Sequence, residues 1–190
     1  MFRKVYKKFL GSTVGAAVLA SLLLAQPGLA GLDILGGRLI QATPFDHKVE
    51  SAGALRAYSF VSLLESVRSS DELFIQARSI RYVPDEPGQD YWQTPQETQA
   101  RWAGDCEDKA IWLYAQLKQN GYANVRLVIG RYRAMDKNYH VWVSMSDGQD
   151  GVFIFDPTAQ KRVWKTSDFT EEFYKPLYSF DGMSRYRHNV

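Results

Sequence analysis

The order of periodic patterns in the 190-residue sequence predicts an α+β fold, with helices first and an antiparallel sheet after them. Between about residues 55 and 120, apolar residues recur every three or four positions, which is helical spacing. After Gly121 the pattern changes to alternation, which is typical of half-buried strands. Hydrophobic residues form 45% of the chain, so one domain of this size can bury a core without disulfides.

The first thirty residues have the three-part layout of a secretory signal peptide. Basic residues precede an uncharged stretch of 17 residues, Phe9 to Ala25, and a small-residue end at Ala30 follows. We therefore expect residues 1–30 to be removed, and residues 31–190 to form one domain in the periplasm or outside the cell. The alternative is an uncleaved segment that anchors the protein in the inner membrane, because the uncharged stretch approaches the length that crosses a bilayer.

Residues 31–53 form a mixed, glycine-containing stretch for which we expect little regular structure. Helical spacing then predicts one helix from about Leu55 and a second that is capped by Ser70 or Asp71. Residues 84–95 contain three prolines and predict a long loop.

A third, short helix is predicted after Thr94, because Pro95 suits the first helical position and Glu97 completes a capping box. The best-marked helix follows Cys106. Its apolar residues keep the three–four spacing up to the stop at Asn120-Gly121, and they are Ala110, Leu113, Tyr114 and Leu117.

Alternating patterns predict three strands after this helix, within residues 124–133, 139–145 and 152–158. The last two are joined by a turn at residues 146–151, so they should be antiparallel neighbours. The aromatic-rich tail from Lys161 is expected to wrap around the domain.

Cys106 is the only cysteine, and it stands at the first turn of the best-marked helix. In an oxidising compartment a lone cysteine either links to another chain or is a working thiol. Unpaired N–H groups and the helix dipole favour a thiolate at this position, whereas the flanking acids Asp105, Glu107 and Asp108 oppose it. We therefore expect a positive partner, either charged His140 or a bound cation.

His140 and Asp156 complete a candidate catalytic triad with Cys106. His140 lies on a predicted strand, and Asp156 ends the next strand, so both could face the same side. A strand histidine or an Asp-Pro turn taken alone is commonly structural. Their joint order predicts instead that His140 takes the thiol proton and that Asp156 orients the imidazole.

The segment DYWQTPQETQARWAGDCEDKA, with HVWVSM and VFIFDPT after it, resembles the bacterial transglutaminase-like cysteine proteinases of the papain-related superfamily. The similarity extends from about Leu73 to Thr158. That family includes periplasmic proteases that clip large surface adhesins. The resemblance therefore implies a papain/transglutaminase-like core, a protein substrate such as a surface adhesin, and an inner-membrane regulator.

The resemblance also implies roles for single residues. Cys106 matches the nucleophile, His140 the general base and acid, and Asp156 the residue that orients the histidine. The backbone N–H of Cys106 would be one donor to the oxyanion, with Trp92 or Tyr91 as a candidate for another.

Asp105 and Glu107 match the positions that bind calcium in the adhesin-clipping branch. Carboxylate oxygens suit this hard cation, and its charge would offset the repulsion between the acids and a thiolate. The alternative is that both acids cap the helix N-terminus. No organic cofactor is expected.

The sequence thus predicts an exported cysteine hydrolase that cleaves peptide or amide bonds through an acyl-enzyme. The residues leave open whether water or an amine resolves that intermediate, the second being transglutaminase chemistry. A third alternative is a non-catalytic binding module with the same fold, against which the lone thiol argues. A net charge of only +2 gives no sign of a nucleic-acid partner, and we expect a monomer.

Overall fold

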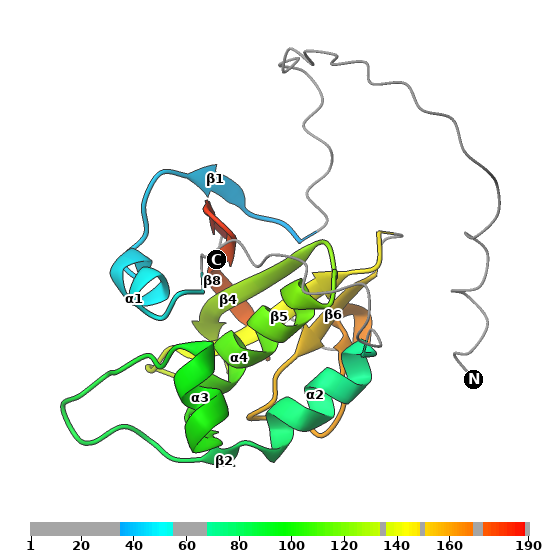
Figure 1. Cartoon of the computed structure of the whole chain (residues 1–190). Coiled ribbons are helices and arrows are strands. Elements are labelled where there is room, and N and C mark those ends of the chain that lie inside the picture. Colours follow the sequence, from blue (N-terminus) through cyan, green and yellow to red (C-terminus); the bar gives the residue numbers. More distant parts are fainter. Residues whose placement is uncertain (1–34, 55–67, 134–135, 149–150, 169–172, 189–190) are drawn as a thin grey trace, which may run out of the picture. The chain divides into compact units, whose positions relative to one another are not determined.

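The computed structural model describes residues 35–54, 68–133, 136–148, 151–168 and 173–188, all of which belong to one compact unit, Leu32–Val190 (Figure 1). The predicted signal peptide at residues 1–30 and most of the helix predicted from Leu55 lie outside the described residues. Within the described ranges, no helix is both long enough and apolar enough to cross a membrane.

Within the described ranges, seven strands form one antiparallel sheet in the order β1-β9-β8-β4-β5-β6-β7. The strands are β1 (Arg38–Ile40), β4 (Val125–Arg131), β5 (His140–Ser146), β6 (Val152–Phe155), β7 (Trp164–Lys165), β8 (Lys175–Asp181) and β9 (Ser184–Arg187). The predicted α+β class is confirmed, and so is the antiparallel pairing of the two strands that carry His140 and precede Asp156.

Among the described residues, four helices accompany this sheet: α1 (Asp46–Ser51), α2 (Ser70–Ser79), α3 (Pro95–Arg101) and α4 (Cys106–Gln119). A 3-10 turn, η1, covers Thr166–Asp168, and a short parallel pair joins β2 (Arg81–Tyr82) to β3 (Ala103–Gly104). Helix α4 packs on β4 and β5, and α2 and α3 pack against α4 (Figure 1). Cys106 therefore stands where the central helix meets the sheet.

Side chains of the central strands alternate between the two faces of the sheet, as a period of two requires. Leu127 of β4 and Val143 of β5 join the main core under α4. Val128, Trp142 and Ile154 form a separate small cluster on the other face. The alternation predicted for both strands is confirmed.

Local capping signals predicted two helix starts. The Thr94 hydroxyl accepts from the Glu97 amide at 3.2 Å, and the Glu97 carboxylate accepts from the Thr94 amide at 2.8 Å, which is the predicted capping box of α3. The prediction of Ser70 or Asp71 as the cap of α2 is wrong by one residue. Ser69 takes the position because its backbone is extended and its hydroxyl accepts from Glu72.

The prediction of little regular structure in residues 31–53 is also wrong. Strand β1 pairs with β9, and α1 is tied to the same strand because Arg185 contacts the carboxylates of Asp46 and Glu50 at 2.9 and 2.6 Å. The C-terminal tail supplies β8, which pairs along β4 next to the core. These partners lie far apart in the sequence, so no local pattern could reveal them.

Candidate active site

The start of α4 is anchored to the loop before α3. The Asp108 carboxylate accepts from the backbone amides of Gln93 and Asp105, at 2.8 and 3.2 Å. Gly104 is required here, because the side chain of Asp108 occupies the space that a Cβ atom would need. These contacts fix the direction in which the chain enters the first turn, and hence the position of Cys106.

The Cys106 thiol lies between α4 and β5 and donates to Oε2 of Glu107 at 3.0 Å. Burial raises the pKa of this thiol, and the charge and hydrogen bond of Glu107 raise it further. The backbone N–H of Val141, the residue after His140, acts in the opposite direction. The helix dipole expected to favour a thiolate is therefore outweighed in the protein alone.

His140 and Asp156 form a direct pair, with 2.7 Å between the imidazole Nε2 and Oδ2 of the carboxylate. Asp156 is completely buried, and His140 is largely covered, with 13% of its side chain exposed. Strand pairing explains the contact: β5 begins at His140, β6 ends at Phe155, and the two strands are antiparallel neighbours. The bond to Asp156 leaves Nδ1 as the imidazole nitrogen that can exchange a proton with another group.

Asp156 carries its charge because several donors surround it. Oδ1 accepts from the backbone amides of Thr158 and Ala159, both at 2.9 Å. Burial alone would raise the pKa of this carboxyl, yet the His140 contact, the Ala159 amide and the Tyr174 hydroxyl together hold it below the ordinary value of 3.8. Asp156 is thus an ionised acceptor inside the protein.

Sequence reasoning missed two side chains that support this carboxylate. The Tyr174 hydroxyl donates to Oδ2 of Asp156 at 2.8 Å, and Gln160 donates to the Tyr174 oxygen at 2.8 Å. Gln160 follows Asp156 by four residues, but Tyr174 belongs to the tail whose placement no local pattern gives. The one signal in the sequence was the polar side chain of Gln160, which follows the Asp156-Pro157 turn closely enough to contact the site.

Both candidate oxyanion donors before the site have their donor groups engaged elsewhere. The Trp92 indole N–H donates to Asp90 at 2.8 Å, and its ring packs in the core. The Tyr91 hydroxyl donates to Glu97 at 2.9 Å, and this side chain is about half exposed. A second oxyanion donor from Trp92 or Tyr91 stays a prediction.

Carboxylates gather beside Cys106. Oxygens of Asp85, Asp90 and Glu107 all lie within 4.8 Å of one another, and Asp105 lies beside Glu107. Burial raises the pKa of Asp105 to about 8, and the hydrogen bond and charge of Glu107 and the charge of Asp85 add to this effect. Burial likewise raises the pKa of Glu107.

This donor set fits a hard cation such as calcium, which takes oxygen ligands. Oδ1 of Asp105 is buried and has no hydrogen-bond partner among the described residues. A buried acceptor without a donor is costly, and a cation would satisfy it. Asp105 and Glu107 were expected here from the sequence. Asp85 and Asp90 were missed, because they lie in the loop about twenty residues earlier.

The chain is thus an α+β domain with a thiol at a helix N-terminus. This helix end lies against a strand whose first residue is a histidine, and that histidine is paired to a buried aspartate. Solved structures of LapG from Legionella pneumophila share this fold. The calcium-bound form has a TM-score of 0.55 and 21% identity, and the match covers 75% of this chain and 77% of LapG. The EGTA-treated form gives the same score and identity over 75% of each chain.

The comparison with LapG shows a shared fold. No protein-family model and no curated protein sequence matches the chain.

Proposed function

We propose that the chain is an exported cysteine peptidase of the transglutaminase-like superfamily, and that Cys106, His140 and Asp156 are its catalytic residues. The observation that carries this proposal is the hydrogen bond between His140 and the completely buried, ionised Asp156, beside a lone thiol at a helix N-terminus. A buried charge of this kind is costly unless it serves a partner, and a histidine held by a carboxylate is the arrangement that general base catalysis requires.

The proposed reaction uses these three residues in turn. His140 takes the proton of the Cys106 thiol, and the sulfur forms a bond to the carbonyl carbon of a peptide. The carbonyl oxygen becomes an oxyanion, to which the backbone N–H of Cys106 donates. The carbon–nitrogen bond breaks as the leaving amine takes the proton from His140. Water then attacks the thioester, again giving a proton to His140, which returns it to the departing sulfur.

Asp156 stays ionised throughout and holds one orientation of the imidazole. Its fixed position, with donors on both oxygens, limits the motion of His140 between the two halves of the reaction. The backbone amides of Thr158 and Ala159 hold the Asp156 carboxylate in place, so its position does not depend on the side chains of these two residues.

Calcium would be held by Asp105 and Glu107 together with Asp85 and Asp90. Bound there, it supplies positive charge that offsets the repulsion of these carboxylates on a Cys106 thiolate. Glu107 is the key residue of this idea, because its carboxylate is both near the other acids and the acceptor of the thiol proton. The calcium-bound and EGTA-treated structures of LapG support a calcium site in this fold.

The substrate class that we propose is a protein at the cell surface, such as an adhesin, and residues 1–30 would direct export. The test is cleavage. Residues 31–190 are incubated with surface proteins of the encoding bacterium in calcium, and new protein N-termini are labelled and identified by mass spectrometry. The same preparation with Cys106→Ser is the control, since it keeps the size of the side chain but removes the thiol.

New N-termini that form with the wild-type protein and not with Cys106→Ser would support the proposal. Equal N-termini in both samples would contradict it. Transfer of an added primary amine, such as a biotinylated amine, to the new C-termini instead of water would assign transglutaminase chemistry.

A further inference from the structure

Two donors share one oxygen of Asp156. Oδ2 accepts from Nε2 of His140 at 2.7 Å and from the Tyr174 hydroxyl at 2.8 Å. Oδ1 is occupied by two backbone amides, which hold the plane of the carboxylate independently of either side chain. A change at Tyr174 therefore acts on the charge that His140 meets, while the carboxylate stays in place.

The direction of the Tyr174 hydroxyl is itself determined. A phenol has one proton to donate, and its oxygen can also accept. The Gln160 side-chain amide donates to this oxygen, which directs the phenol proton to Asp156. The three contacts thus form a chain in which Gln160 donates to Tyr174 and Tyr174 donates to Asp156, the acceptor of His140.

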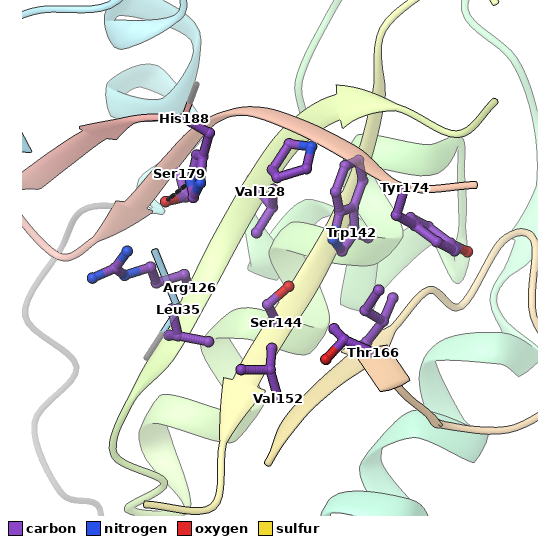
Figure 2. A pocket seen from close by; sticks show the side chains of 12 residues that line it. Leu35, Arg126, Val128, Trp142, Ser144, Val152, Thr166, Tyr174, Ser179 and His188 are labelled. Atoms are coloured by element: carbon purple, nitrogen blue, oxygen red, sulfur yellow. Dashed lines mark hydrogen bonds between the residues drawn. The ribbon is translucent and has the colours of Figure 1, made fainter. Parts of the chain in front are cut away.

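Aromatic packing fixes the ring as well. Tyr174 meets Trp142 and Tyr132 edge to face, with ring centroids 5.1 and 5.2 Å apart. Trp142 in turn stacks near the His140 ring at 6.2 Å. The Tyr174 ring borders a cavity of about 110 Å³ on the sheet face that carries Trp142, and Figure 2 shows its hydroxyl pointing away from the other labelled residues of that cavity.

We propose that Tyr174 is a positioning residue for the reaction at Cys106, acting through Asp156 on His140, and that Gln160 directs its hydroxyl. The inference rests on the proposed function. By sharing Oδ2, the hydroxyl moderates how strongly Asp156 attracts the His140 proton, and it confines the imidazole to one side of the carboxylate. Burial and the charge of Asp156 raise the pKa of Tyr174, so the phenol stays a donor.

The test compares Tyr174→Phe with Tyr178→Phe. Both remove one phenol oxygen, from positions four residues apart, but Tyr178 packs on Phe45 and not on Asp156. The first readout is the rate at which iodoacetamide alkylates Cys106, the only cysteine, in calcium-containing buffer at neutral pH. The second is the downfield proton resonance of the His140 ring N–H, identified by its loss in His140→Gln.

We expect Tyr174→Phe to slow alkylation about tenfold, the scale of one hydrogen bond to a charged group, because the imidazole is then no longer confined to one side of the carboxylate. The His140 resonance should move further downfield, because Oδ2 of Asp156 then accepts from His140 alone. Tyr178→Phe should change neither. Gln160→Leu should move both readouts in the same direction by less, and it tests the idea with the Tyr174 ring intact should Tyr174→Phe fold poorly. Circular dichroism melting curves check folding of each variant.

An unmoved resonance, or an alkylation rate equal to that of Tyr178→Phe, would overturn the role of Tyr174 and leave a packing residue. Failure of the proposed function gives a different pattern. In that case His140→Gln alkylates as fast as the wild-type protein, before any tyrosine variant is compared.

Discussion

Buried carboxylates lie on two parts of the candidate site, and their pKa values are shifted in opposite directions. Asp156 is completely buried, yet its pKa lies below the ordinary value. Asp105 is 9% exposed, and its pKa is raised to about 8. Burial acts in the same direction on both, so the difference comes from their neighbours. Asp156 has four hydrogen-bond donors, whereas Asp105 faces Glu107 and Asp85, which are acids.

The two sides of the site therefore differ in how far the protein itself satisfies their carboxylates. The His140–Asp156 side is satisfied by the protein itself, because backbone amides, a phenol and an imidazole meet every demand of the carboxylate. The acidic side brings together carboxyl groups that repel one another as charges, which contributes to the raised pKa of Asp105, although Lys48 contacts Asp90. That side fits a cation, and for this reason we propose that calcium acts on the thiol.

We expect the largest effect from a change in the His140–Asp156 pair. Asp156→Asn removes the charge that orients His140 and presents an amide that can donate where the imidazole N–H needs an acceptor. We expect the rate of substrate cleavage to fall by about 10³- to 10⁴-fold, as for an aspartate of this type in a catalytic triad. Asp168→Asn, at an exposed position, is the control and should leave the rate unchanged. A loss below tenfold would contradict the role of Asp156.

The second largest effect is expected when calcium binds to the acidic cluster of Asp85, Asp90, Asp105 and Glu107. Saturating calcium should raise the melting temperature by about 5–10 °C, because a ligand at 100 times its Kd adds about 2.7 kcal/mol to the free energy of unfolding. Differential scanning calorimetry in calcium and in EGTA measures the shift. Asp85→Asn should reduce it, and the exposed Asp136→Asn should not. Equal melting temperatures in calcium and EGTA would argue against the site.

The free energy of unfolding as a function of pH tests whether the pKa of Asp156 is lowered in the fold. The folded pKa of Asp156 lies below 3.8, so its ionisation stabilises the fold above about pH 4, and this contribution is lost as pH falls through the folded pKa. In urea titrations, the wild-type protein should exceed Asp156→Asn in free energy of unfolding at pH 6, and the gap should narrow between pH 4 and pH 3. A gap that stays constant over this range would show that folding leaves the pKa of Asp156 unchanged, and would contradict the lowered folded pKa.

The smallest effect concerns a feature outside both groups. Thr94→Ala removes the capping box of α3, and we expect a loss of about 1 kcal/mol in the free energy of unfolding. Alkylation of Cys106 should keep its wild-type rate, which would separate loss of stability from loss of reactivity. If Thr94→Ala slowed alkylation as much as Tyr174→Phe, general destabilisation would explain both.

Sequence reasoning succeeded where the determining contacts are local. The capping box of Thr94, the start of α4 at Cys106, and the alternation of β4 and β5 depend on residues within a few positions of one another. It also placed His140 and Asp156 on neighbouring strands, since one turn joins them.

It failed where contacts join distant segments. Tyr174 reaches Asp156 through the pairing of β8 with β4, and Asp85 reaches Glu107 through a loop without regular structure. No periodic pattern in the sequence predicts either contact. The burial that raises the pKa of Cys106 was likewise hidden, although the sequence did predict that Glu107 and Asp105 oppose a thiolate.

The most direct measurement of the central claim is the rate of iodoacetamide alkylation of Cys106 in residues 31–190, with calcium and with EGTA, for the wild-type protein, His140→Ala and His47→Ala. His47 is exposed and lies outside the site, so its variant is the matched control. We predict fast alkylation in calcium for the wild-type protein and His47→Ala, and slow alkylation for His140→Ala and in EGTA. Equal rates in all these samples would contradict a thiol that His140 and calcium make reactive.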